Sequence, residues 1–169
     1  PYNGTTVVSS KEAMILEKQP KSMVIIGAGA IGMEFGYIYN AFGTEVTIVE
    51  MMPNCLPVED DEIADAITKS YKKAGINCLT DTKVTATKDN GSSVTITVEN
   101  SSGTKEITAE CCLVAIGVAP VLPRGEQPTL TDRGWVQIDE RYQTSIPNVF
   151  AIGDIAGPPW LAHPSIIHI

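Results

Sequence analysis

Three glycines and one glutamate have the spacing of a dinucleotide-binding site. The stretch Gly27-Ala28-Gly29-Ala30-Ile31-Gly32 has the pattern G-x-G-x-x-G. In that pattern the first glycine makes a tight turn, the second lets the backbone approach a pyrophosphate, and the third lets a helix pack closely on a strand. Unpaired N–H groups at the start of the helix then face the phosphates. We therefore expect this loop to bind a dinucleotide.

Glu50 stands where such a site would contact the adenosine ribose. It lies 18 residues after Gly32, close to the expected spacing of about 20. A carboxylate there accepts hydrogen bonds from both ribose hydroxyls and repels a 2′-phosphate, and the following Met51 and Met52 supply no positive charge. This favours NAD(H) over NADP(H). Glu34, on the first turn of the helix, is either a solvated surface charge or a group that faces the nicotinamide.

The surrounding sequence predicts the elements that would position these residues. An apolar run over 23–26 predicts a buried strand before the glycines, and residues 30–42 predict a helix after them. A second strand over 46–49 ends directly before Glu50. The helix would carry one apolar stripe, formed by Ile31, Phe35, Ile38 and Phe42.

The next segment predicts a second helix and then a change of period. The acidic cluster over 59–62 could mark a metal or acid–base site, but we favour the view that it complements the positive end of a helix that stops at Gly75. Beyond Gly75 the hydrophobic period changes from 3.6 to 2. A strand over 76–79 and a hairpin around the turn at 89–92 are expected. The antiparallel strands are predicted over 83–88, 94–99 and 105–110.

The fold class that results is α/β, a Rossmann-like parallel sheet flanked by helices, with an antiparallel three-stranded β-meander. The run 111–116 predicts a return strand into the main sheet, 135–138 a short strand and 149–152 a last buried strand. The expected organisation is a linking segment with a loop and a short helix over 1–22, a dinucleotide-binding domain over 23–152 and a C-terminal segment over 153–169.

Composition limits the class of protein. The chain has 169 residues, of which 43% are hydrophobic and 19% charged, which suits one folded domain and excludes a disordered chain. Twelve Lys and Arg against 20 Asp and Glu give a net charge of −8. We therefore expect neither nucleic acid nor a membrane surface as partner. No apolar run approaches about 18 residues, so no transmembrane span is expected.

The cysteines favour a packing role. Cys55, Cys78, Cys111 and Cys112 form no C-x-x-C pair and have no histidine at metal-ligand spacing, so we expect no metal site. The adjacent Cys111 and Cys112 would point to opposite faces of a strand. Reduced cysteines and the lack of a visible secretory signal predict a cytoplasmic protein. Because the sequence begins with Pro1 rather than Met, we expect it to be part of a longer polypeptide.

Further motifs follow the glycine loop in a characteristic order. They are the stretches Gly27–Gly36, Ala115-Ile116-Gly117-Val118-Ala119-Pro120, Thr144–Asp154 and Leu161-Ala162-His163, with Glu50 between the first two. Together they resemble the FAD-dependent pyridine nucleotide–disulfide oxidoreductases, and within that family the dihydrolipoamide dehydrogenases. The resemblance runs from about Thr5 to His163.

This resemblance implies a role for each matching residue. The NAD(H)-binding residues would be Gly27, Ala28, Gly29, Ala30, Ile31, Gly32, Met33 and Glu34, with Glu34 near the nicotinamide, and Glu50 at the adenosine ribose. Val84 and Gly117 would line the nucleotide site. Asp154 would contact the ribityl chain of FAD. The backbone along the flavin would belong to Trp160, Leu161, Ala162 and His163.

The resemblance also implies a larger parent enzyme. The family has an FAD domain with its own glycine motif, a redox Cys-x₄-Cys pair and a dimerisation domain with a catalytic His–Glu pair. None of these is in this sequence, so we expect no catalytic residue in it. The parent would be a homodimer that passes electrons from lipoyl-bearing proteins through a disulfide and FAD to NAD⁺. This chain alone would bind NAD(H) without turnover. The alternatives are the NAD domain of an NADH oxidase-like or mercuric reductase-like enzyme, or a free-standing NAD-binding module.

Overall fold

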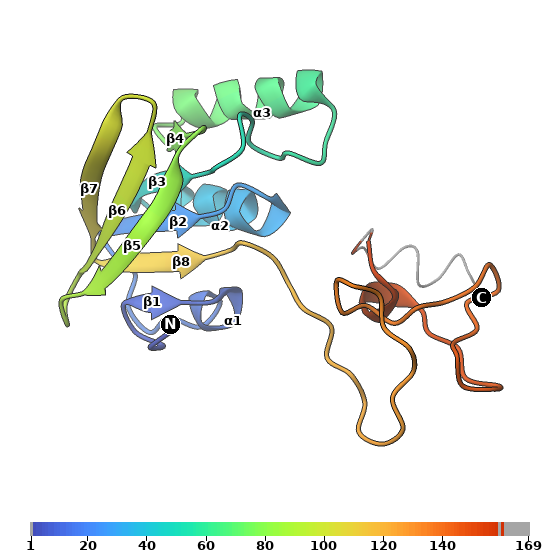
Figure 1. Ribbon diagram of the computed structural model, residues 1–169. Coiled ribbons are helices and arrows are strands. Elements are labelled where there is room, and N and C mark those ends of the chain that lie inside the picture. Colours follow the sequence, from blue (N-terminus) through green and yellow to red (C-terminus); the bar gives the residue numbers. More distant parts are fainter. Residues whose placement is uncertain (1, 159, 161–169) are drawn as a thin grey trace. The chain divides into compact units, whose positions relative to one another are not determined.

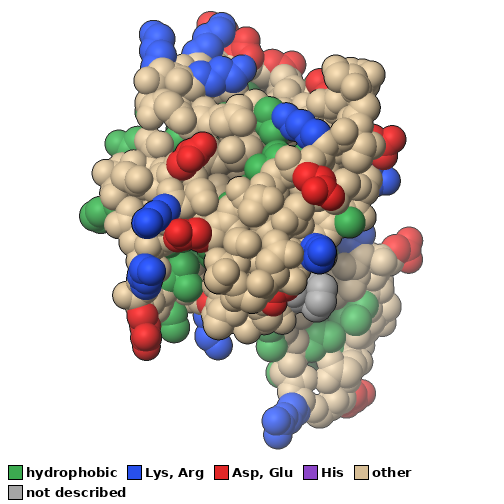
Figure 2. Space-filling view, turned by 90° about the vertical axis from the view of Figure 1, so that its left-hand side faces the viewer, with side chains coloured by type: hydrophobic (Ala, Val, Ile, Leu, Met, Phe, Trp, Pro, Cys, Tyr) green, Lys and Arg blue, Asp and Glu red, His purple; other side chains and the backbone are tan. Residues whose placement is uncertain are grey.

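The computed structural model describes residues 2–158 and 160 and divides the chain into two compact units between Gly117 and Val118. The first unit contains both β-sheets and the helices α1 to α3 (Figure 1). In the described part of the chain, none of the helices has the length and apolar character needed to cross a bilayer. Figure 2 shows basic and acidic side chains interspersed over one face of the molecule.

A parallel five-stranded sheet forms the middle of the first unit. Its strands stand in the order β1-β8-β2-β3-β4. The predicted strands before and after the glycine loop are present, with Met23 opposite Val46 in the register of β2 and β3. β1 was not predicted; it pairs in parallel with β8 and so makes part of segment 1–22 an edge of the sheet. The bounds are β1 Val7–Val8, β2 Ser22–Ile26, β3 Glu45–Val49, β4 Asn77–Leu79 and β8 Cys111–Val114.

Three helices accompany this sheet. They are α1 (Ser10–Ala13), α2 (Ala30–Ala41) and α3 (Asp61–Lys73). At α3 the Asp60 carboxylate accepts a hydrogen bond from the Glu62 backbone N–H at 3.0 Å. The acidic cluster thus lies at the helix N-terminus, where negative charge is favourable. No group of residues that could bind a metal ion occurs in the described segments.

The two faces of the parallel sheet are covered by different structures. Met23 and Ile25 point to the face packed by the helices, whereas Val24 points to the other face. That second face is covered by the predicted antiparallel meander, through Val94, Ile96 and Val98 of β6. Cys111 and Cys112 belong to the opposite cores, as expected from their adjacency. The meander strands are β5 Lys83–Asp89, β6 Val94–Asn100 and β7 Gly103–Ala109, in the order β5-β6-β7.

The surface of α2 that faces the sheet is its glycine side rather than the predicted apolar stripe. Gly36 is buried, and a Cβ there would lie 2.8 Å from Ile48 Cδ1. The missing side chain lets the helix approach β3 closely, which turns the stripe outward. Phe42 is therefore 74% exposed and Ile38 46% exposed.

The second unit contains no strand within its described residues. The predicted buried strand over 149–152 is wrong, because Phe150 is 59% exposed and forms only an isolated bridge with Gln143. The short strand predicted over 135–138 is likewise reduced to a bridge between Val136 and Leu130. Loop hydrogen bonds replace a sheet here, such as the one from Thr144 N–H to the Val149 carbonyl at 2.8 Å. The unit includes a 3-10 helix, η1 (Gly153–Ala156).

If the meander completes the core, shortening a buried side chain on β6 should destabilise the chain. Ile96 is fully buried, so we expect Ile96→Ala to lower the free energy of unfolding by about 2–5 kcal/mol. Thr104→Ala, at an exposed position of β7, should change it by less than about 0.5 kcal/mol. Urea unfolding followed by circular dichroism measures both. Equal stabilities of the two variants would contradict the packing described here.

Candidate functional site

The predicted site residues of the first unit meet at the carboxyl edge of the parallel sheet. Gly27 directly follows β2, Glu50 follows β3 and Ala115 follows β8. β2 stands between β3 and β8, and the chain passes from β2 through α2 to β3 on one side, while β8 lies on the other. This is a topological switch point, the place at which open α/β sheets bind their ligands.

The glycines of the loop differ in what a side chain would meet. At Gly27 φ is +102°, and an added Cβ would lie 2.5 Å from the Ala115 carbonyl oxygen. At Gly32 an added Cβ would overlap the Gly27 carbonyl oxygen. At Gly29 nothing lies within 4 Å of an added Cβ. The fold therefore needs the first and third glycines, whereas the second leaves open space in front of the backbone, as a pyrophosphate would require.

Glu50 is fixed beside this loop by hydrogen bonds to its carboxylate. Its side chain is only 8% exposed, and among the described residues it is the one carboxylate in the buried class. Oε2 accepts from the Ala28 backbone N–H at 2.8 Å, and Oε1 accepts from the Met52 N–H at 2.9 Å. A carboxylate has about four acceptor sites. Each oxygen therefore keeps capacity for a further donor such as a ribose hydroxyl.

A second hydrogen bond, from a residue that the sequence did not single out, fixes the same peptide. The Leu56 N–H donates to the Ala28 carbonyl oxygen at 2.8 Å, so both backbone groups of Ala28 are bound by the segment 50–56. Leu56 has a φ of +52°, a conformation that is rare for a bulky side chain. No local sequence signal predicts a leucine in this conformation.

The start of α2 presents its remaining predicted residues in different environments. Ala30 is exposed and Ile31 half-buried. Met33 is 2% exposed and packs in the core on the helix face of the sheet, so only its backbone could approach a ligand. Glu34 is exposed, which leaves it free of the core and near the N-terminal end of α2.

Two further predicted residues lie at or beyond strand ends in the first unit. Val84 of β5 is half-buried and packs on the core beneath the meander, to which Ile26 and Val114, at the ends of β2 and β8, also belong. Gly117 follows β8 with a φ of +140° and has open space around an added Cβ. Their places are compatible with the lining of a site at this edge.

The residues predicted to contact a flavin belong to the second unit. Asp154 is exposed in η1. The Trp160 ring lies 5.3 Å from the Trp135 ring, centroid to centroid. Leu161, Ala162 and His163 lie outside the described residues. The structure thus brings Glu50 to the glycine loop, and it places Asp154 and Trp160 only within the second unit.

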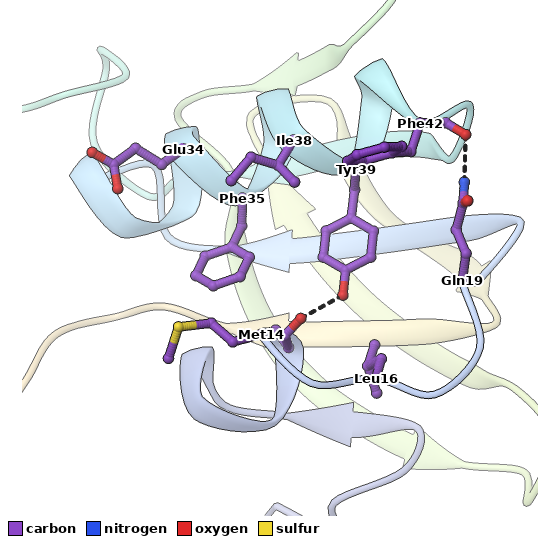
Figure 3. Close-up of a pocket in the computed structure, with 9 residues that line it drawn as sticks. Met14, Leu16, Gln19, Glu34, Phe35, Ile38, Tyr39 and Phe42 are labelled. Atoms are coloured by element: carbon purple, nitrogen blue, oxygen red, sulfur yellow. Dashed lines mark hydrogen bonds between the residues drawn. The ribbon is translucent and has the colours of Figure 1, made fainter.

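A groove of about 470 Å³ runs between α1 and α2, apart from the glycine loop (Figure 3). The outward stripe of α2 forms one side of it, with Phe35, Ile38 and Phe42. Tyr39 crosses its floor and donates a hydrogen bond to the Ala13 carbonyl at 2.6 Å. Glu34 lies at one end of the α2 side chains that line the groove in this view. The groove is mainly apolar and lacks the convergent polar groups of a dinucleotide site.

Comparisons with known proteins give matches in both sequence and structure. The sequence pattern of the family described as pyridine nucleotide-disulphide oxidoreductase matches residues 2–168. A dihydrolipoyl dehydrogenase of Mycobacterium bovis is 44% identical in an alignment of 161 positions, which covers 93% of this chain and 35% of that protein. The mitochondrial dihydrolipoyl dehydrogenase of Caenorhabditis elegans is 39% identical in a gapped alignment of 175 positions, which covers 96% of this chain and 35% of that protein.

Solved structures share the fold. The HOCl-induced flavoprotein disulfide reductase RclA from Escherichia coli superposes with a TM-score of 0.85 at 28% identity, covering 99% of this chain and 39% of that one. LpdA from Mycobacterium tuberculosis gives a TM-score of 0.86 at 22% identity, covering 98% and 36%. The chain thus spans about a third of the length of the proteins it matches.

The environments of the glycines predict different costs for two similar substitutions. Gly32→Ala should lower the free energy of unfolding by about 2–3 kcal/mol, because the new methyl group overlaps backbone that has to shift. Gly29→Ala should cost less than about 1 kcal/mol, because its surroundings are open and alanine is only a poorer helix cap. Chemical unfolding curves of the two variants measure the difference. A larger loss at Gly29 than at Gly32 would contradict these roles.

Proposed function

The chain belongs to the pyridine nucleotide-disulphide oxidoreductase family, and from this premise we propose that it binds NAD(H) as the nucleotide domain of a dihydrolipoyl dehydrogenase-like flavoenzyme. The observation that carries the proposal is the buried Glu50 carboxylate, bonded to the Ala28 N–H at 2.8 Å beside the open face of Gly29. Both groups lie at the carboxyl edge of the sheet, where a dinucleotide would stretch across the switch point.

Each part of NAD(H) has a group on this edge that suits it. The pyrophosphate would lie against the backbone at Gly29, where the N-terminus of α2 offers unpaired N–H groups and partial positive charge. The adenosine ribose would donate its hydroxyls to the remaining acceptor sites of Glu50. A 2′-phosphate would instead meet a fixed negative charge, which supports a preference for NAD(H) over NADP(H). Glu34 and Gly117 would line the path toward the nicotinamide.

The activity of the whole protein is part of the same proposal. In it, a dihydrolipoyl dithiol would be oxidised through a protein disulfide and FAD, and NAD⁺ would accept the electrons; that chemistry belongs to the disulfide and the cofactors. This chain supplies the binding and orientation of NAD(H), and the remaining two-thirds of such a protein would supply the rest. Asp154 and Trp160 would then contribute to the FAD site. The free thiols of all four cysteines support a reducing, cytoplasmic setting.

A second candidate is the nucleotide domain of another flavin-dependent disulfide reductase. The likeness to RclA, a flavoprotein disulfide reductase, favours it. The 44% identity to a dihydrolipoyl dehydrogenase exceeds the 28% identity to RclA, so we place this second candidate after the dihydrolipoyl dehydrogenase-like one. Assays of the intact enzyme with dihydrolipoamide and with other dithiols would separate the two.

Removing the charge of Glu50 should weaken NADH binding and reduce its selectivity. We expect Glu50→Gln to raise the NADH dissociation constant about 10-fold or more, since a hydrogen bond to a charged group contributes about 1.5–3 kcal/mol. NADPH binding should fall less, because the repulsion of its 2′-phosphate is removed. Fluorescence titration measures both, with Glu106→Gln on the exposed side of β7 as a matched control. Unchanged NADH titrations of a folded Glu50→Gln chain would remove Glu50 from the site.

The chain alone should bind NADH without catalysis. We expect no dihydrolipoamide-dependent reduction of NAD⁺ by the 169-residue chain, because no residue in it is assigned to the disulfide or the flavin reaction. Absorbance of NADH in a flavin-free preparation provides the measurement, with an intact dihydrolipoyl dehydrogenase as positive control. Sustained turnover by the flavin-free chain would overturn this division of roles.

A further inference from the structure

Two cysteines lie on neighbouring segments next to the candidate site. Cys78 is in β4, where it stands opposite Ile48 of β3. Cys55 is in the loop that follows β3. Beyond the strands these two segments stay joined, since the Asp81 N–H donates to the Met52 carbonyl at 3.0 Å. Both cysteines pack in the same core, on the helix face of the sheet.

The two thiols interact directly. The side-chain interaction with Cys78 lowers the pKa of Cys55 against the opposing effect of burial. The Lys72 ammonium of α3 acts on the Cys55 pKa in the same direction, whereas the Glu50 carboxylate acts in the opposite direction. The same sulfur contact raises the pKa of Cys78. Of the two thiols, Cys55 is therefore the one that forms a thiolate more readily.

The remaining cysteines provide a contrast within the same chain. Burial raises the pKa of Cys111 to about 11 and that of Cys112 to about 12. They point to opposite faces of β8 and belong to different cores. At Cys111 a hydrogen bond from the Cys112 backbone lowers the pKa but is outweighed by burial, and the opposite orientations of the two side chains keep their sulfurs apart.

The loop around Cys55 is a surface segment. Cys55 is 1% exposed, but it is the one buried residue of the segment 51–60. Cys78 is half-buried. A small oxidant could reach the sulfurs through local opening of this loop, which has few buried side chains to resist it.

We propose that Cys55 and Cys78 form a reversible intramolecular disulfide on exposure to hydrogen peroxide, and that this bond acts on the glycine loop through Leu56. The Cys55 thiol releases its proton, and the thiolate attacks one peroxide oxygen, so that an S–O bond forms and the O–O bond breaks. The leaving hydroxide takes up that proton and becomes water. The Cys78 sulfur then attacks the Cys55 sulfur; the S–S bond forms, the S–O bond breaks, and the proton of Cys78 leaves with the hydroxide as a second water. Two thiols lose two electrons in total, and one peroxide is reduced to two waters.

The consequence for the site follows from the position of Leu56. A disulfide requires the sulfurs to approach to about 2.05 Å, closer than a hydrogen-bonded pair. The approach pulls Cys55 toward β4, and the neighbouring Leu56, already at a φ of +52°, donates the hydrogen bond to Ala28. This step rests on the proposed NAD(H) function. Formation of the disulfide weakens NADH binding several-fold, and reduction by a dithiol restores the binding.

Peptide mapping tests the pair independently of nucleotide binding. The reduced 169-residue chain is treated with hydrogen peroxide under native conditions, alkylated in denaturant and digested without reduction. We expect mass spectrometry to find a peptide that joins Cys55 to Cys78, with Cys111 and Cys112 alkylated. Alkylation of both Cys55 and Cys78, or cross-links distributed over all four cysteines, would overturn the proposal. The same oxidation in urea serves as a control in which the fold cannot select the pair.

Variants and titrations then separate the two steps. Cys78→Ala should prevent the intramolecular cross-link, so that peroxide no longer removes two thiols together. The matched control Cys111→Ala should still form the Cys55–Cys78 cross-link. If either variant does not fold, the peptide map of the unaltered chain still decides. NADH titration of the oxidised and the dithiothreitol-reduced chain tests the link to the site. Equal affinities would overturn that link. A reduced chain that does not bind NADH would instead refute the proposed function and leave the peptide map as the test of the disulfide.

Discussion

The peptide of Ala28 is the fixed point on which the candidate site depends. Its N–H is bound by the Glu50 carboxylate and its carbonyl by the Leu56 N–H, each at 2.8 Å, and its side chain is fully buried. A glycine loop is permissive by nature, because glycine adopts many backbone conformations. Two hydrogen bonds from the segment after β3 remove that freedom where a pyrophosphate would need a defined surface. The segment after β3 thus positions the glycine loop that follows β2.

The sheet that brings these strands together is stabilised differently on its two faces. Parallel strands are normally buried on both sides, and here α1, α2 and α3 cover one face while β5 to β7 cover the other. The meander suits this task because β6 alternates, with Val94, Ile96 and Val98 buried. Its own Val84 belongs to the same core as the ends of β2 and β8. The antiparallel layer therefore supports the carboxyl edge as well as the centre of the sheet.

The sequence predicted the features that depend on neighbouring residues. The glycine motif, the hairpin turn and the acidic start of α3 are local signals, and each occurs as expected. The orientation of α2 was not predictable from its stripe, because the close approach at Gly36 depends on Ile48 of another strand. β1 consists of Val7 and Val8 alone, too short for a periodic signal. The apolar run over 149–152 resembles a buried strand, but strand formation needs a neighbouring strand, which this run lacks in the described chain.

Within the site, the sequence identified Glu50 as a ligand-binding residue but gave no sign of its structural role. Burial of an unpaired carboxylate costs several kcal/mol, and backbone donors offset that cost. Glu50 satisfies this requirement with Ala28 and Met52 before any ligand is present. Its remaining acceptor sites are then already oriented, so a ribose would not have to order the side chain that binds it. The same loop contains Cys55, so a covalent change next to Leu56 would reach the Ala28 peptide without touching the nucleotide. The selectivity for NAD(H) and the proposed redox response therefore both depend on residues 50–56. This segment follows β3 and is hydrogen-bonded to the glycine loop that follows β2.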